Sequence, residues 1–303
     1  MIRVLFLGTS SSTPTKNRSL PCIMLLRDGE QLVFDCGEGC QRQMVKAGIG
    51  LRKNLKIFIT HMHADHVLGL AGMLMTMSLM GRQDPLDVFG PPGIARFVEC
   101  LMEVFGFNPD YEVNLHQVSS GVICRGRGYR IEAFEVNHSV PSYGYALVED
   151  DRPGKFDPKK ALELGVPRGP LWKALQRGEA VNVGGRVVRP EDVMGPPRRG
   201  LKVVYTGDTA PTRSVIEVAR GADLLIHDAT FDDSLEELAR EELHSTARQA
   251  AQVALEAGVK LLVLTHISPR YEDTSQLLAQ ARSVFSNSLV AEDFMELTLR
   301  WED

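Results

Sequence analysis

Three histidines and an aspartate stand within six residues in the first quarter of the chain. His61, His63, Asp65 and His66 follow the short apolar run 55–60 and precede a run with helical character. Imidazole and carboxylate groups together suit Zn²⁺, with Mn²⁺ or Fe²⁺ as alternatives. In a tight loop, the rings of His61 and His63 can turn to one side while Asp65 and His66 point to a neighbouring position. This spacing favours two metal ions over one.

Further histidines and aspartates follow apolar runs elsewhere in the chain. They are Asp35, Asp208, His227, Asp228 and His266. Such runs predict buried strands, and ligands of α/β sheets bind at the loops that follow the strands. A structural zinc finger is the alternative, but no cysteines have finger spacing and a chain of this length needs no zinc to fold. The pattern therefore predicts a catalytic metal centre.

The elements that must position these residues alternate along the chain. Apolar runs of four to six residues, from "RVLFLG" to "KLLVLT", predict strands. The clearest helical pattern is "HSTARQAAQVALEAGV", which ends at Gly258. This alternation predicts an α/β protein in which helices cover a largely buried sheet.

The composition is that of a globular protein, with 44% hydrophobic and 24% charged residues. The first residues lack the features of a signal peptide. The longest apolar stretch, 67–80, is too short and too interrupted to span a bilayer, so we expect no membrane partner. The five cysteines include no C-x-x-C pair, so we expect reduced thiols and a cytoplasmic protein.

One segment, residues 152–199, differs from the rest in charge. It holds eleven basic and five acidic residues, a surplus of +6, although the net charge of the whole chain is −5. Seven prolines fall between 153 and 197, and only two short helices are predicted there. We expect a basic, flexible arm that projects from the domain without a hydrophobic core of its own. A basic solvated loop is the alternative.

The motifs together resemble those of a known family. Residues 61–66 match the H-x-H-x-D-H signature of the metallo-β-lactamase superfamily, and Asp35, His138, Asp208 and His266 follow its other landmarks. Within the superfamily, the chain is similar to the ribonuclease Z endonucleases that process tRNA 3′ ends. That similarity lies in "GTSSSTPTKNRS", "FDCGEGCQRQ", "NHSVPSYGY", "HDATF", "HSTARQAA" and "THISPRY", which span almost the whole chain. The resemblance implies one metallo-β-lactamase αβ/βα sandwich over residues 1–303, with the arm inserted at about 152–199.

The resemblance also assigns metal ligands. One ion would be held by His61, His63, His138 and Asp208. The other would be held by Asp65, His66, His266 and the bridging Asp208. Asp35 would orient a ligand histidine through a hydrogen bond.

Three residues would carry the proton chemistry. Asp65 would be both ligand and proton acceptor. His244, in "HSTA", would hydrogen-bond the developing charge or protonate the leaving 3′ oxygen. Asp228 would hold the tautomer of His244, although the family usually has glutamate at this position.

Substrate contacts are expected in three places. Lys16 and Arg18 lie in "PTKNRS", which resembles the family loop near the tRNA 3′ end, although a polar turn is the alternative. Arg270 follows His266 closely enough to reach a scissile phosphate. Gly169 and Pro170 lie in "GVPRGPLWKALQRGE", which resembles the arm with which the family grips tRNA.

The resemblance implies a homodimeric zinc endoribonuclease that cuts precursor tRNA on the 3′ side of the discriminator region. The tRNA would keep a 3′-hydroxyl and the trailer a 5′-phosphate. One alternative is a hydrolase of a small ester, sulfate or cyclic phosphodiester. Another is a non-catalytic RNA-binding protein on the same scaffold, which the intact ligand set disfavours. The basic arm favours tRNA, because a small substrate has no need of it.

Overall fold

A computed structural model of the chain describes residues 1–51 and 54–301, and two seven-stranded sheets dominate it. The first sheet has the order β16-β1-β2-β3-β4-β5-β6. Its strands are β1 (Ile2–Gly8), β2 (Cys22–Arg27), β3 (Glu30–Phe34), β4 (Leu55–Phe58), β5 (Leu86–Gly90), β6 (Val113–Gln117) and β16 (Glu296–Leu299). Strands β3 to β6 run parallel, so their carboxyl ends share one edge.

The second sheet has the order β15-β14-β13-β12-β9-β8-β7. Its strands are β7 (Gly121–Gly126), β8 (Tyr129–Glu135), β9 (Tyr143–Glu149), β12 (Lys202–Tyr205), β13 (Leu224–Asp228), β14 (Leu262–Thr265) and β15 (Ser288–Val290). Strands β12 to β15 are parallel, which brings the residues that follow them to a common edge.

Aromatic side chains from both sheets fill the space between them. Phe34 and Phe58 of the first sheet stack with ring centroids 5.1 Å apart. Tyr145 and Tyr205 of the second sheet lie 5.9 and 6.2 Å from the ring of Phe34. All four side chains are buried, so the sheets pack face to face over one core.

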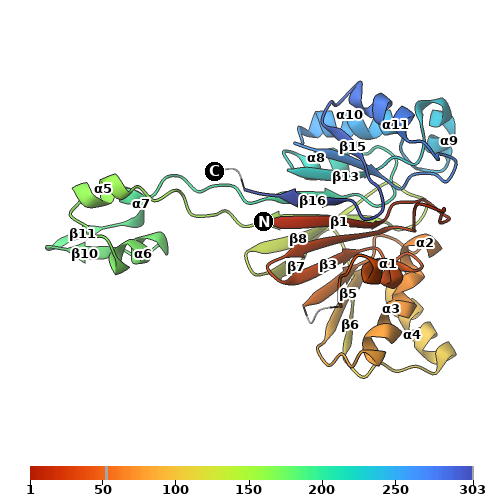
Figure 1. Cartoon of the computed structure of the whole chain (residues 1–303), viewed down its shortest axis with the longest axis horizontal. Coiled ribbons are helices and arrows are strands. Elements are labelled where there is room, and N and C mark those ends of the chain that lie inside the picture. Colours follow the sequence, from red (N-terminus) through yellow and green to blue (C-terminus); the bar gives the residue numbers. More distant parts are fainter. Residues whose placement is uncertain (52–53, 302–303) are drawn as a thin grey trace. The chain divides into compact units, whose positions relative to one another are not determined.

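Helices cover the outer face of each sheet (Figure 1). The first sheet is covered by α1 (Cys40–Lys46), α3 (Gly69–Leu79) and α4 (Ile94–Phe105). The second is covered by α8 (Arg213–Ala219), α10 (Ala247–Ala257) and α11 (Ser275–Arg282). Shorter helical segments are α2 (Ala64–Val67), η1 (Asp233–Leu235) and α9 (Glu236–Glu241). The predicted αβ/βα layering is confirmed, with two sheets in the middle.

The start of α10 matters for the site. The Thr246 side chain accepts a hydrogen bond from the Gln249 amide, and the Gln249 side chain accepts one from the Thr246 amide. This reciprocal cap begins the helix at Ala247, so His244 and Ser245 stay in the preceding loop. The helix ends at Gly258, whose φ of 62° suits glycine.

Residues Glu149–Gly200 form a second compact unit, drawn in green in Figure 1. Its elements are α5 (Pro158–Glu163), α6 (Pro170–Gln176), β10 (Val181–Val183), β11 (Arg186–Val188) and α7 (Pro190–Val193). The expectation that this segment lacks a core was wrong. Its buried apolar side chains are Ala161, Val166, Leu175, Val181, Val188 and Val193. They are too widely spaced to form a periodic pattern, and only the folded helices and hairpin bring them together.

Within 1–51 and 54–301, the structure has no helix whose length and apolar character would suit a membrane span.

Candidate metal centre and active site

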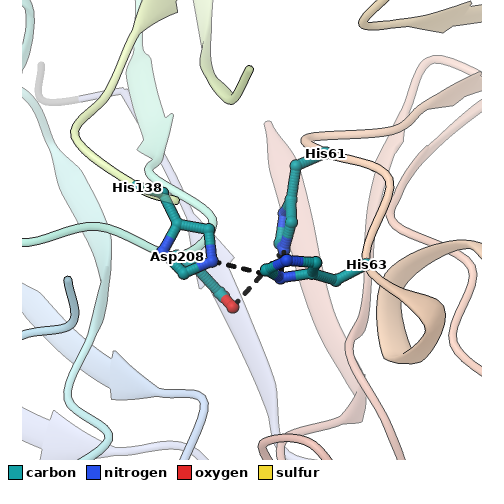
Figure 2. A group of neighbouring side chains, drawn as sticks. All are labelled: His61, His63, His138 and Asp208. Carbon is teal, nitrogen blue, oxygen red and sulfur yellow. Dashed lines mark hydrogen bonds and ion pairs between the residues drawn. The ribbon is translucent and has the colours of Figure 1, made fainter. Parts of the chain in front are cut away.

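The first group of expected ligands converges between the two sheets. His61 and His63 follow β4, His138 lies between β8 and β9, and Asp208 follows β12. Each offers one ligand atom, and these four atoms lie within 4.8 Å of one another (Figure 2). His63 Nδ1 is 3.1 Å from both His61 Nε2 and His138 Nε2.

The second group lies beside the first. One ligand atom each from Asp65, His66 and His266 falls within 4.8 Å of the others. Asp208 joins the groups, because its Oδ2 is 3.6 Å from His61 Nε2 and 3.3 Å from His66 Nε2. The same oxygen is 3.2 Å from His266 Nε2. The structure thus brings together all seven residues expected as ligands.

The donor atoms fit divalent cations. Within the described chain, His66 Nε2, His266 Nε2 and Asp208 Oδ1 are buried without a hydrogen-bond partner. Buried polar atoms are seldom left this way, and each costs about 1–3 kcal/mol. Burial also lowers the pKa of His61, His63 and His138, which favours the neutral imidazole that binds metal. A pair of cations would satisfy these atoms.

Asp35 orients one ligand from outside the group. Its buried carboxylate accepts hydrogen bonds from His66 Nδ1, the Thr60 amide and Tyr205 Oη, each at 2.8 Å. Because His66 donates through Nδ1, its Nε2 lone pair faces the cluster. Asp35 itself has a φ of 60°, which turns the chain sharply at the end of β3.

Two threonines, which the sequence did not single out, join ligand histidines to buried carboxylates. Thr60 Oγ1 lies 2.9 Å from His61 Nδ1 and donates to Asp35. Thr230 Oγ1 lies 2.8 Å from His266 Nδ1 and donates to Asp228 Oδ1 at 2.7 Å. Each hydroxyl accepts from an imidazole and donates to an aspartate, which fixes the histidine tautomer.

His244 is held beside the second group by Asp228. The distance from His244 Nδ1 to Asp228 Oδ2 is 2.7 Å. Burial would lower the pKa of His244, but the Asp228 carboxylate raises it to about 9. Asp228 is buried and also accepts from the amides of Thr209 and Thr230. The family usually has glutamate at this position, but the shorter side chain of Asp228 also reaches His244.

The residues expected to contact substrate are in different settings. Lys16 is exposed. Arg270 is exposed, with its guanidinium 4.9 Å from the centre of the Phe231 ring. Arg18 instead points inward, where its Nη1 donates to Thr9 Oγ1 at 2.7 Å and to the Ala291 carbonyl at 2.5 Å. These two bonds of Nη1 hold the loop, and a contact between Arg18 and substrate stays a prediction.

Gly169 and Pro170 belong to the smaller unit. Gly169 precedes α6 with a φ of 134°, a conformation that favours glycine. Pro170 is the first residue of α6, where its missing N–H breaks no helical bond. Both are exposed at the start of the helix.

Known proteins similar to this chain decide its family. Residues 2–152 match the model of the anti-Pycsar protein Apyc1, and residues 185–267 match the beta-lactamase superfamily domain. The chain is 50% identical over 300 residues to a ribonuclease Z of Methanosarcina acetivorans, a match that covers 99% of this chain and 98% of the relative. A ribonuclease Z of Methanothermobacter thermautotrophicus is 48% identical over 100% of this chain and 98% of its own length. The chain belongs to the ribonuclease Z family.

Solved structures agree with membership of the ribonuclease Z family. The short form of human tRNase Z is 27% identical and superposes with a TM-score of 0.72, over 98% of this chain and 99% of that one. The metallo-beta-lactamase fold protein YhfI from Bacillus subtilis, at 19% identity and a TM-score of 0.68, covers 98% of each chain and shares the fold. The predicted family and metallo-β-lactamase fold are confirmed, and the chain is an endoribonuclease.

Proposed function

We propose that this endoribonuclease uses two divalent metal ions to cut precursor tRNA on the 3′ side of the discriminator region. The tRNA keeps a 3′-hydroxyl and the trailer carries a 5′-phosphate. The observation that carries the proposal is the convergence of seven ligand side chains from both sheets in a chain of the ribonuclease Z family.

Zinc is the first choice of metal. The donor set has five imidazoles and two carboxylates, which suits Zn²⁺ best, with Mn²⁺ or Fe²⁺ as alternatives. His61, His63, His138 and Asp208 would hold one ion, and Asp65, His66, His266 and Asp208 the other. When bound, the ions supply Lewis-acid chemistry, since they lower the pKa of water and neutralise charge on a phosphodiester.

Asp65 is placed to accept a proton at the edge of the site. Its Oδ2 is 3.5 Å from His266 Nε2 and 3.6 Å from His66 Nε2. Burial would raise the pKa of Asp65, but its contacts with these histidines hold the pKa below the usual range. The carboxylate is therefore ionised at neutral pH and can take the proton of an attacking water.

His244 is placed to return a proton to the leaving group. A pKa of about 9 keeps its imidazole protonated at neutral pH. With Nδ1 bound to Asp228, Nε2–H remains for the leaving 3′ oxygen of the tRNA.

The smaller unit supports a tRNA substrate. Its exposed basic residues are Lys155, Lys159, Lys160, Arg168, Lys173, Arg177, Arg186, Arg189 and Arg199. We propose that this surface, with the start of α6 at Gly169 and Pro170, is the exosite that binds the folded part of the tRNA. Such phosphate contacts are independent of base sequence and sensitive to salt.

Removing charge from the exosite tests the choice of substrate. A variant with Lys159→Gln, Lys160→Gln and Lys173→Gln alters three exposed side chains and leaves the core of the unit intact. Cleavage of precursor tRNA and of a small chromogenic phosphodiester should be compared at two salt concentrations. We expect weaker tRNA cleavage, with the salt slope reduced by roughly 0.7–0.9 for each phosphate that is no longer neutralised, and unchanged diester hydrolysis.

The matched control neutralises three exposed arginines of the larger unit, Arg96, Arg125 and Arg220. Its tRNA cleavage should stay near that of the unaltered protein. Equal tRNA cleavage by the exosite variant and the unaltered protein would reject the exosite and favour a small-substrate hydrolase.

We also propose a homodimeric, cytoplasmic enzyme. Large apolar side chains are exposed on the helical face of the first sheet, among them Val45, Leu79 and Val104, and Leu79 is 88% exposed. A second copy could cover this surface, which light scattering would test. All five cysteines lie in the described ranges and are free thiols, as expected in a reducing compartment.

A further inference from the structure

A backbone amide of the N-terminal loop, residues 9–19, contacts the metal centre. The Ser12 amide donates a hydrogen bond to Asp65 Oδ2 at 2.8 Å. This is the same oxygen that lies near His66 and His266. A donor on a ligating carboxylate fixes the rotation of that carboxylate, and such outer contacts govern metal affinity.

Ser12 has a backbone conformation that is uncommon for a residue with a side chain. Ser12 has a φ of 53°, which few residues other than glycine adopt. Two bonds fix the segment around it: the Ser11 amide donates to the Ile267 carbonyl at 3.0 Å, and the Ile267 amide donates to the Thr9 carbonyl at 2.9 Å. Ile267 follows the ligand His266, so the loop spans both sheets at the metal centre.

Asp293, far along the chain, fixes the two ends of this loop. It lies between β15 and β16. Its Oδ1 accepts from Thr9 Oγ1 at 2.8 Å, and its Oδ2 accepts from the Ser19 amide at 2.7 Å. Gln43 Nε2 of α1 donates to Oδ2 as well, at 2.9 Å. One carboxylate thus joins the first and last residues of the loop to a helix.

Thr9 is the residue at which these bonds meet. Its buried hydroxyl donates to Asp293 and accepts from Arg18 Nη1. The amides of Thr9 and Ser10 both donate to the Ser19 carbonyl at 2.9 Å, which closes the base of the loop. The side chain of Thr9 therefore connects the far carboxylate to the segment that carries Ser12.

We propose that Asp293 is a positioning residue for Asp65, acting through Thr9 and the Ser12 amide. Within the described residues, the hydrogen bonds of Asp293 go to Thr9, Ser19 and Gln43, which are not metal ligands. Asp293 holds the two ends of the loop together. The closed loop places the Ser12 amide against Asp65 Oδ2, and this hydrogen bond keeps the oxygen beside His66 and His266. The inference rests on the proposed metal centre and not on the identity of the RNA substrate.

Stepwise metal binding tests this role. Zn²⁺ is titrated into metal-free protein against a competing chelator, and Asp65→Ala identifies the step that belongs to the second ligand group. We expect Asp293→Asn to weaken that step by about 10–100-fold and to leave the other step unchanged. The kcat for a small phosphodiester should fall while KM holds.

A pair of variants at Thr9 separates positioning from general stability. Thr9→Val keeps the shape and removes the hydroxyl, so it should reproduce the effect of Asp293→Asn. Thr9→Ser keeps the hydroxyl, so its second binding step should have the affinity of the unaltered protein. The control is Asp223→Asn, because Asp223 is also buried and accepts a backbone bond, from Lys202 at 2.8 Å, away from the loop.

The binding steps of these four variants distinguish a positioning role of Asp293 from a purely structural one. A selective loss of the second step in Asp293→Asn and Thr9→Val, absent from Thr9→Ser and Asp223→Asn, supports the proposal. Equal weakening of both steps, or no change in either, overturns it and leaves Asp293 with a structural role alone. Unaltered protein that binds two ions but does not cut precursor tRNA would reject the proposed substrate and not this inference.

Discussion

At the scale of single residues, the site depends on how its imidazoles are held. Nδ1 of His61 and of His266 meets a threonine hydroxyl, and Nδ1 of His66 meets Asp35 directly. His138 Nδ1 donates to the Leu243 carbonyl at 3.1 Å. In each case Nδ1 is the donor, so Nε2 is left to bind metal.

Replacing His244 should separate proton transfer from metal binding. His244 lies with Asp208 and His266 in a third group of close ligand atoms, but each of the two proposed sites has its ligands without it, so both metal ions should remain bound in His244→Ala. Cleavage should slow by about 10²–10⁴-fold, the usual contribution of a general acid. Metal content by atomic absorption and single-turnover cleavage would measure the two effects. An emptied metal site would show that His244 is a ligand.

Removing the hydroxyl of Thr60 should weaken the first ligand group. Thr60→Val leaves His61 Nδ1 without its acceptor and Asp35 with one donor fewer. We expect metal affinity to fall by about 10–100-fold, as for other outer partners of a ligand histidine. Thr60→Ser keeps the hydroxyl and serves as control. Equal affinities in the two variants, measured by chelator competition, would contradict this role.

The ligands could be predicted from the sequence because four of them lie within six residues in a recognisable pattern. The threonine contacts could not, since each hydroxyl also bonds a residue far away in the sequence, Asp35 for Thr60 and His266 for Thr230. Arg18 was expected to face RNA because "PTKNRS" resembles the family loop near the tRNA 3′ end. Its actual partners, Thr9 and Ala291, include one from the opposite end of the chain.

At the scale of elements, the junction between α2 and α3 packs against the loop after β3. The Gly69 amide donates to the Cys36 carbonyl at 2.8 Å, and the Cys36 amide donates to the His66 carbonyl at 2.8 Å. A Cβ on Gly69 would overlap the backbone of Gly37. This close approach keeps Asp35 beside His66.

Adding a methyl group at Gly69 should therefore disturb the site through its support. Gly69→Ala should destabilise the fold by about 1–3 kcal/mol through overpacking and weaken metal binding. Gly72→Ala, in the same helix, is the matched control, because the atoms nearest to its Cβ would be those at the flexible end of the Gln41 side chain. That variant should be neutral or more stable by up to about 1 kcal/mol. Urea unfolding of both variants without metal would measure their free energies of unfolding. Similar decreases in the two variants would refute the packing argument.

Strands β3, β4, β12, β13 and β14 could be predicted because each is a compact apolar run that ends at or shortly before a polar residue of the site. The start of α10 was placed too early. The pattern from 244 onward is helical in composition, but the reciprocal hydrogen bonds of Thr246 and Gln249 begin the helix at Ala247. That difference is what leaves His244 free to turn toward Asp228.

At the scale of the whole molecule, the two sheets share the metal centre. The first sheet contributes the ligands that follow β4, and the second contributes His138, Asp208 and His266. Bound ions would therefore join the halves of the sandwich as well as activate water.

Metal removal should affect both activity and stability. The protein should bind two divalent ions per chain, and a strong chelator should abolish cleavage. Ligand at 1,000 times its Kd contributes about 4 kcal/mol to stability at one site, so the melting temperature should fall on chelation and recover with Zn²⁺. One ion per chain with full activity, or an unchanged melting temperature, would contradict the two-metal assignment.

The way the smaller unit is inserted has a consequence for how such chains can diversify. The chain leaves through β9 and returns through β12, and these neighbouring strands pair antiparallel, with Val148 opposite Lys202. Just inside the insertion, the amides of Arg152 and Arg198 each bond the other's carbonyl, at 2.8 and 2.9 Å. Entry and exit are therefore adjacent, and the inserted residues carry their own core. We therefore expect that the inserted segment can be lengthened, exchanged or shortened to a tight hairpin while the pairing of β9 with β12 stays in register.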